Sequence, residues 1–187
     1  REALAAAQGG TDIIDLKNVL EGSLGANFPW VIQSVVRGLR GRKVDFSAAI
    51  GDLDDKPGTA ALAARGAASC GVDYVKAGIY GAANRARARA VISAFARAAK
   101  DVNRSVIPVA AAYGDYRRFR GLSPLDLVAA AKGTGAGMVM LDSLDPHVTA
   151  ILRLLVRFFR SPDRRSTDAL PPPVNVMSPP FKLMRLK

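Results

Sequence analysis

Two lysines lie near the carboxyl-terminal ends of short apolar segments, where a charged side chain has to be paired or used. Residues 13–17 are Ile-Ile-Asp-Leu-Lys, and residues 74–78 are Tyr-Val-Lys-Ala-Gly. Side chains alternate between the two faces of a strand, so Asp15 and Lys17 share a face and Lys76 can point the same way. Two desolvated lysines that repel each other favour the neutral amine. A neutral amine attacks carbonyl carbons, so the pattern predicts Schiff-base chemistry.

A simpler interpretation is that Lys17 only reaches solvent at a strand end while Asp15 caps a loop. For a single lysine this is the commoner arrangement, because lysines are seldom fully buried. Two lysines at equivalent positions weaken that interpretation. The chain has eight lysines and nineteen arginines, and an arginine could not act as the nucleophile because it stays protonated.

Five short apolar segments are the expected strands that would position these lysines. They are rich in β-branched residues, as buried strands are. They comprise residues 13–17, 44–51, 74–78, 105–113 and 138–142. Their first residues are 31, 30, 31 and 33 positions apart. Eight strand-helix units of about this size make the roughly 250 residues of a parallel (β/α)8 TIM-type barrel, and a doubly wound open sheet is the competing fold.

Helix-compatible segments separate the expected strands, and their ends carry suitable residues. Residues 2–8 form a first helix, and Asn27 and Ser123 are expected N-caps because each stands shortly before a proline. Gly71 and Gly133 fall where a helix ends and the chain needs a left-handed residue. Gly133 also begins a Gly-x-Gly-x-Gly run, which we interpret as a helix-to-strand loop because a dinucleotide fingerprint follows a strand.

The barrel pattern is incomplete at both ends. The helix over residues 2–8 should follow a strand that this sequence does not contain, and the strand due near residue 169 meets three prolines at 171–173. We therefore expect residues 1–147 to form a barrel portion without its first strand and last two strands. Residues 148–187 are a divergent basic extension, helical over 148–160 and irregular beyond residue 161.

Composition limits the remaining possibilities. With one cysteine, Cys70, and one histidine, His147, we expect no disulfide and no metal site within one chain. Cys70 is expected to be a small buried apolar residue at a helix end. No 18-residue apolar stretch and no signal peptide is visible, so a cytoplasmic location without a membrane partner is expected.

The net charge of +11 is unevenly distributed. Residues 148–187 hold eight basic and two acidic residues, a net charge of +6, which leaves 19 basic against 14 acidic residues, or +5, in residues 1–147. The expected barrel portion is thus only mildly basic, and no nucleic-acid partner is expected for it.

Several motifs around these lysines resemble those of (5-formylfuran-3-yl)methyl phosphate synthases, a furan-forming family of methanofuran-type cofactor biosynthesis. The matching segments, in order, are residues 15–18, 21–27, 50–52, 56–59, 74–80, 113–116 and 139–142. The resemblance covers about residues 1–146. It implies a lyase that joins two molecules of glyceraldehyde 3-phosphate with loss of phosphate and water, and that needs no cofactor.

The resemblance also implies roles for the charged residues. Lys17 matches the lysine expected to form a Schiff base with the triose phosphate, and Lys76 matches a residue expected to move protons. An iminium acidifies the adjacent carbon, which suits aldol joining and phosphate elimination. Asp15 would orient an amine or carry a proton. Asp142, which ends an otherwise apolar strand, is the fourth expected catalytic residue.

Seven further residues are expected to bind the substrate or its phosphates. They are Asn18, Ser23, Gly25, Asn27, Asp52, Lys56 and Asp115. The glycine-rich turn over residues 21–27 could offer amides to a phosphate, or its glycines could only serve the turn. Lys56 could pair with a second phosphate or remain a solvated loop lysine.

The sequence departs from the family after Ser143. A lysine usual in the family is missing from residues 144–147, and nothing in 148–187 matches the family's last strands. One alternative is therefore an inactive fragment whose basic tail binds a membrane surface or nucleic acid. Another is a class I aldolase-like enzyme acting on a different small aldehyde. A homo-oligomer is expected in the enzyme interpretation.

Overall fold

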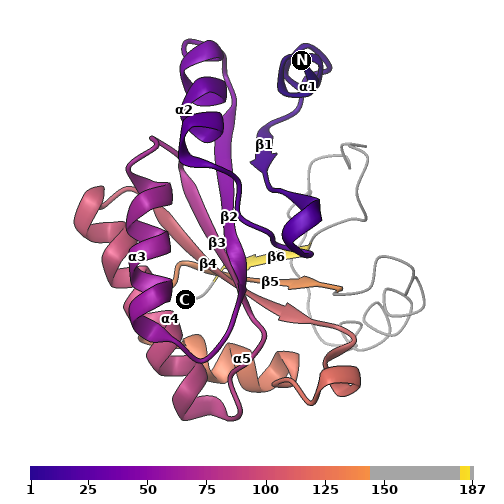
Figure 1. Cartoon of the computed structure of the whole chain (residues 1–187), viewed down its shortest axis with the longest axis vertical. Helices are drawn as coiled ribbons and strands as arrows, with labels where there is room; N and C mark the ends of the chain where they lie inside the picture. The colour runs from indigo at the N-terminus through magenta and orange to yellow at the C-terminus, as the bar shows by residue number, and fades with distance from the viewer. Residues whose placement is uncertain (144–181, 186–187) are drawn as a thin grey trace, which may run out of the picture.

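A computed structural model describes residues 1–143 and 182–185 of the chain (Figure 1). Within them, five parallel strands form a half-barrel in which each strand pairs with the next along the chain. The strands are β1 (Ile13–Leu16), β2 (Asp45–Leu53), β3 (Tyr74–Ile79), β4 (Ile107–Tyr113) and β5 (Met138–Asp142). All five lie where the sequence predicts them, and sequential pairing is barrel-like rather than doubly wound.

A sixth strand, β6 (Lys182–Arg185), pairs antiparallel with β5. Its register sets Leu141 opposite Lys182 and Met138 opposite Arg185. The expectation that the chain is irregular throughout beyond residue 161 is therefore wrong at this segment. An open sheet edge offers unpaired backbone groups to any extended segment, so such pairing needs no periodic signal in the sequence. The expected helix over 148–160 lies outside the described residues.

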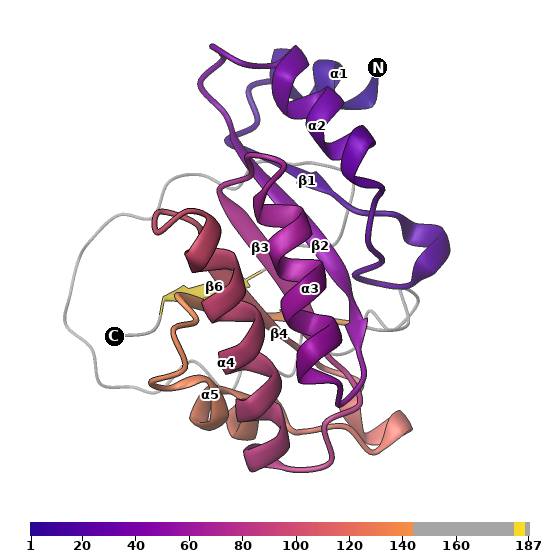
Figure 2. The same cartoon turned by 60° about the vertical axis from the view of Figure 1, so that its left-hand side comes forward.

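Helices alternate with the parallel strands. They are α1 (Glu2–Gln8), α2 (Pro29–Gly38), α3 (Pro57–Ala68), α4 (Arg85–Val102) and α5 (Pro124–Ala131), with short 3-10 helices η1 (Val19–Glu21) and η2 (Tyr116–Phe119) after β1 and β4. The turned view shows α3 and α4 running side by side in front of the sheet, with α2 above them (Figure 2). The opposite face of the sheet carries Asp15 and Lys76, as the alternation predicts.

The predicted helix ends are partly confirmed. Ser123 accepts a hydrogen bond from the Asp126 amide and caps α5, and Gly71 and Gly133 adopt φ of 86° and 71°. The assignment of Asn27 as the N-cap of α2 is wrong, because Phe28 occupies that position. The Asn27 side chain instead accepts from the Phe28 amide and donates to the Lys17 carbonyl, which ties the turn to β1.

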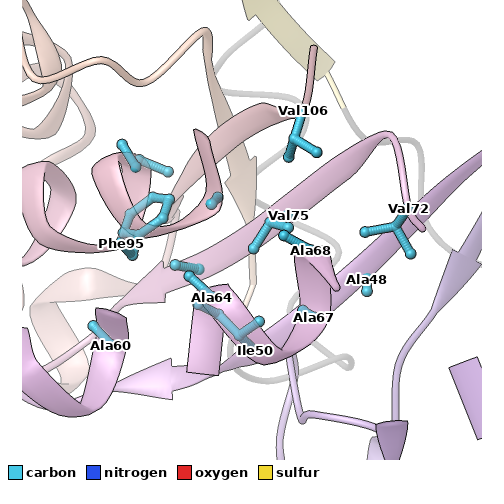
Figure 3. Close-up of a cluster of buried hydrophobic side chains, with 14 of the residues drawn as sticks. Ala48, Ile50, Ala60, Ala64, Ala67, Ala68, Val72, Val75, Phe95 and Val106 are labelled. Carbon is cyan, nitrogen blue, oxygen red and sulfur yellow. The ribbon is translucent and has the colours of Figure 1, made fainter. Parts of the chain in front are cut away.

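Small side chains let the helices approach the sheet closely. Ala60, Ala64 and Ala68 of α3 are at most 3% exposed and pack over Ile50 and Val75 (Figure 3). This helix-side cluster is the main core of the described residues. Cys70 belongs to it and is buried, as predicted, and burial raises the pKa of its thiol.

A smaller apolar cluster lies on the opposite face of the sheet. Its buried members are Leu24, Ala49, Val109, Ala111 and Met140. Leu24 comes from the turn after β1 and is 0% exposed, so this turn is anchored on the strands. None of the helices in the described part of the chain is long and apolar enough to cross a membrane.

Arginines near the start of α4 connect neighbouring elements. Arg85 pairs with Asp126 of α5, and Arg87 pairs with Asp55 in the loop after β2. Arg89 donates to the backbone carbonyls of Ala130 and Lys132 at the end of α5. These contacts involve exposed guanidinium groups, so each adds little to stability but helps to orient the helices.

The helix-side core predicts a large cost for Phe95→Ala. Phe95 of α4 is 0% exposed, and removing a buried phenyl ring typically costs about 3–5 kcal/mol. Urea unfolding followed by circular dichroism should show this loss in the free energy of unfolding. Leu62→Ala on α3 is the control, because Leu62 is 76% exposed and should change stability by only about 0.5 kcal/mol or less. Equal effects of the two substitutions would contradict the assigned core.

Candidate active site

An ion pair between a buried lysine and a more exposed aspartate joins β1 and β3 on the face of the sheet opposite the helices. The Lys76 Nζ atom lies 2.5 Å from Asp15 Oδ2, and the Lys76 side chain is 8% exposed. Ser47 of β2 donates its hydroxyl hydrogen bond to Asp15 Oδ1 over 2.9 Å. The predicted alternation thus brings Asp15 and Lys76 together, with the carboxylate oriented by its neighbour strand.

Lys17 belongs to a second set of contacts, which extends to β5. Its Nζ donates to the backbone carbonyl of Ser23 over 3.3 Å. The Ser23 hydroxyl donates to Asp142 Oδ2 over 3.3 Å and lies 2.9 Å from the Ser143 carbonyl oxygen. Ser23 therefore connects Lys17 at the end of β1 with Asp142 at the end of β5.

Asp142 lies within the electrostatic reach of both lysines. Burial raises the pKa of its carboxyl group, and this effect outweighs the lowering by the Ser143 amide, by Lys17, by Ser23 and by Lys76. A carboxyl group whose pKa is raised by desolvation can hold a proton near neutral pH more readily than a solvated one. The four residues predicted to be catalytic thus meet at one edge of the sheet.

The turn over residues 21–27 is held by contacts within the protein. The Leu24 amide donates to Asp52 Oδ2 and the Gly25 amide to the Gly22 carbonyl. Gly22 has φ of 132°, a conformation that side chains rarely adopt, and a Cβ on Gly25 would clash with the Asn18 carbonyl. The glycines therefore serve the turn itself, and two of its amides are already paired.

Asn18 stabilises the start of the segment that follows Lys17. Its side-chain oxygen accepts from the Leu20 amide and caps η1, while its amide nitrogen donates to Glu21. Its backbone amide donates to the Gly25 carbonyl over 2.9 Å. These contacts close the loop between β1 and α2 on itself.

Asp52 reaches the same face of the sheet because β2 contains a bulge. Ala49 pairs with Lys76 and Asp52 pairs with Gly78, so β2 uses one residue more than β3 between these positions. Gly51, with φ of 118°, lies within this irregular stretch. A bulge changes the face to which the following side chains point. Asp52 therefore points to the same face as Lys76, where it contacts the turn over residues 21–27.

Tyr113 is a functional candidate that sequence reasoning missed. It is 1% exposed, and its hydroxyl makes a short hydrogen bond with Asp52 Oδ1. Burial, followed by the charge of Asp52, raises the pKa of Tyr113 well above its usual range, so it stays a protonated donor. The signals available in the sequence were its place at the end of β4 and the match of residues 113–116 to a family motif.

Two further predicted binding residues follow β2 and β4. Lys56 follows β2, is 67% exposed and forms an ion pair with Asp54 over 3.1 Å. Asp115 is 6% exposed and lies just beyond β4, where its charge also acts on Tyr113. No three His, Cys, Asp or Glu residues within 1–143 and 182–185 are arranged to hold a metal ion. His147 lies outside the described residues.

Comparison with known proteins identifies the family. The model of the 4-HFC-P synthase family matches residues 1–157. The chain belongs to the 4-HFC-P synthase family. Its relatives include the (5-formylfuran-3-yl)methyl phosphate synthases of Archaeoglobus fulgidus, 50% identical, and Methanosarcina mazei, 49% identical, each over 142 residues that make up 76% of this chain. The resemblance noticed in the motifs is thereby confirmed.

The match covers only part of those relatives. It spans 60% of the length of the proteins from Archaeoglobus fulgidus and Methanosarcina mazei, and also of the Methanocaldococcus jannaschii protein, which is 45% identical over 142 residues. All the residues that meet at the sheet edge fall within the 4-HFC-P synthase match.

The electrostatics of this family member predict a pH-dependent effect of Asp142→Asn. Because burial raises the pKa of folded Asp142 above its ordinary value of 3.8, ionising it destabilises the native state once the pH rises through the folded pKa. Below the unfolded pKa both states are protonated and this cost is absent. Asp142→Asn should therefore be more stable than the parent at pH 7, and the advantage should disappear near pH 3.

Urea unfolding at both pH values measures this effect. Asp12→Asn, at an exposed position before β1, is the matched control and should leave the pH dependence unchanged. The difference in the free energy of unfolding between Asp142→Asn and the parent is compared at the two pH values. A difference that favours the variant less at pH 7 than at pH 3 would contradict the assigned cause of the pKa shift.

Proposed function

We propose that this chain acts as a Schiff-base lyase that condenses two molecules of glyceraldehyde 3-phosphate into a (5-formylfuran-3-yl)methyl phosphate, with loss of phosphate and water. The observation that carries the proposal is the meeting of Lys17, Lys76, Asp15 and Asp142 at one edge of the sheet. Family membership supports the choice of reaction, since the relatives are named for this product. The spacing of two amines around one partly buried carboxyl group supports imine chemistry.

Lys17 is the proposed nucleophile. Its amine would attack the aldehyde carbon of the triose phosphate, and the carbonyl oxygen would leave as water to give an iminium ion. The positive nitrogen then withdraws electrons from the adjacent carbon, so the proton there can be removed and the resulting enamine can attack a second aldehyde. Alternatively, the electron pair of the enamine can shift toward the carbon beyond and expel phosphate, which leaves with the electron pair of its C–O bond.

Lys76, Asp15 and Asp142 are the proposed proton carriers. Lys76 is paired with Asp15 over 2.5 Å, an arrangement in which a proton can be given up and recovered by the same two groups. Asp142, whose pKa is raised by burial, can donate a proton to a leaving oxygen. Its contact with Ser23 keeps it within the set that includes Lys17.

The phosphate groups are assigned to the loops around these carriers. Asn18, Ser23 and Asn27 lie in the loop after β1 and Lys56 follows β2, whereas Asp115, after β4, would accept a hydrogen bond from a substrate hydroxyl. Lys56 would exchange its ion pair with Asp54 for a phosphate, which costs little because both side chains are exposed. The parallel half-barrel would belong to an eight-stranded barrel in which residues 1–147 form one part.

The imine step can be tested by reductive trapping at Lys17. Borohydride added with glyceraldehyde 3-phosphate should reduce the imine and leave a stable mass increase on the peptide that holds Lys17. Lys17→Arg should abolish that adduct, because arginine stays protonated. Lys132→Arg, at an exposed position beyond α5, is the control and should keep it. A folded parent protein without the Lys17 adduct would refute the proposal.

The proton-carrying role predicts a different result for Lys76→Met. The Lys17 adduct should still form, but product formation should fall by at least about a hundredfold, the usual contribution of a general acid or base. Trapping and product release, followed by mass spectrometry and by absorbance of the furan aldehyde, measure the two steps separately. Loss of trapping together with turnover, in a variant that folds normally, would assign Lys76 to imine formation instead.

A further inference from the structure

Tyr113 is buried and Asp52 is half-buried, and the two side chains contact each other close to the turn that follows the proposed reactive lysine. Tyr113 of β4 donates to Asp52 of β2, and the second oxygen of Asp52 accepts the Leu24 amide over 3.4 Å. The Leu24 carbonyl in turn accepts from the Gly51 amide over 2.9 Å. Two strands and one turn are thus joined by three hydrogen bonds around a single carboxylate.

The turn held in this way carries the groups that position Lys17. Ser23, immediately before Leu24, accepts from Lys17 Nζ through its carbonyl oxygen and donates to Asp142 through its hydroxyl. The Leu24 side chain is 0% exposed and packs with Val109 of β4. A movement of the turn would therefore move the hydrogen-bond partner of the reactive amine.

Two glycines leave the space that this arrangement needs. A Cβ built on Gly78 would overlap the Tyr113 hydroxyl and lie 2.7 Å from Asp52 Oδ1. A Cβ on Gly22 would overlap the other oxygen of Asp52. The Asp52 carboxylate consequently fills a space bounded by the backbone of β3 on one side and by the backbone of the turn on the other.

We propose that Tyr113 and Asp52 are positioning residues that lock the Gly22–Gly25 turn against the sheet and so fix the amine of Lys17 relative to Asp142. Neither residue binds phosphate or carries a proton of the reaction. This assignment replaces the substrate-binding role expected for Asp52 and gives a role to Tyr113. The effect of this positioning on catalysis rests on the proposed function, whereas the positioning itself is a property of the protein without substrate.

The surroundings of the pair agree with a fixed hydrogen bond rather than a proton relay. The raised pKa of Tyr113 keeps its proton on the phenol, and Asp115 and Asp142 contribute to this effect after burial and Asp52. The phenol ring is also held at its edge by Tyr80 and Phe119, whose ring centroids lie 6.3 Å and 5.5 Å away. These two rings thus help to hold the Tyr113 hydroxyl donor in place.

Competitive acylation of lysines tests the positioning without requiring any reaction on an aldehyde. A trace amount of an acetylating ester labels Lys17 and Lys43. Peptide mass spectrometry then gives the labelling ratio, which is the acetylation of Lys17 divided by that of Lys43. Lys43 is an exposed internal reference located before β2, at the opposite edge of the sheet. In Tyr113→Phe and in Gly78→Ala, the turn should release Lys17, and the ratio should rise by at least about threefold, as expected for losing one hydrogen bond.

Matched variants separate this effect from general destabilisation. Tyr80→Phe removes a hydroxyl from the neighbouring ring, and Gly66→Ala adds a methyl group where no atom lies within 4 Å. Both should leave the labelling ratio unchanged. An unchanged or lowered ratio in Tyr113→Phe and Gly78→Ala, in protein with a normal far-ultraviolet spectrum, would overturn the proposal.

Borohydride trapping distinguishes positioning from phosphate binding. With Tyr113→Phe, trapping at Lys17 should change by the same factor for glyceraldehyde 3-phosphate and for unphosphorylated glyceraldehyde, because the amine rather than a phosphate site is disturbed. A decrease confined to the phosphorylated aldehyde would overturn the positioning role. If the parent protein gives no adduct, the proposed lyase function fails, whereas the labelling ratio still decides the positioning role.

Discussion

The ion pair between Lys76 and Asp15 constrains the arrangement of three strands. Asp15 is opposite Ser47 and Lys76 is opposite Ala49, so the pair crosses β2 and also runs along it by two residues. Neighbouring strands lie about 4.8 Å apart, so only a side chain as long as lysine can span the intervening strand. Removing Asp15 would take this carboxylate away from the Lys76 amine, whose side chain is only 8% exposed. The pair therefore favours one register of β1, β2 and β3.

Small residues on both faces of the sheet make this register possible. Ala49 is 1% exposed and has a side chain too short to block the path of Lys76 toward Asp15. On the other face, alanines of α3 allow the helix to lie close to β2 and β3 (Figure 3). An alanine-rich wall gains less from burial per residue than a leucine-rich one. Its advantage is close packing, which holds the strand ends that carry the charged groups.

Side-chain alternation was enough to predict part of the site from the sequence. It correctly set Asp15 and Lys76 on one face, because β1 and β3 are regular and their apolar residues mark the other face. It could not place Asp52, since the bulge near Gly51 reverses the face of the residues that follow. A glycine inside a strand is a known sign of a bulge, but its effect on register depends on the neighbouring strand.

Interactions between distant segments account for the rest of what the sequence did not reveal. Tyr113 stands in an alanine-rich strand, where its ring is expected to be buried, but its hydroxyl partner is 61 residues away. β6 likewise takes its place by pairing with β5 rather than by any periodicity of its own. Each outcome is decided by tertiary contacts that the local pattern does not encode.

The division between reactive and supporting groups follows from which strand carries them. Residues on β1 and β3 and the end of β5 provide the amines and carboxyl groups that meet, whereas β2 and β4 contribute Asp52 and Tyr113. Alternate strands of a parallel barrel send side chains to different layers, so reactive groups from β1, β3 and β5 can share one layer. The bulge in β2 brings Asp52 to the turn beside that layer. A carboxylate in this position stabilises the turn by accepting hydrogen bonds from the Leu24 amide and the Tyr113 hydroxyl.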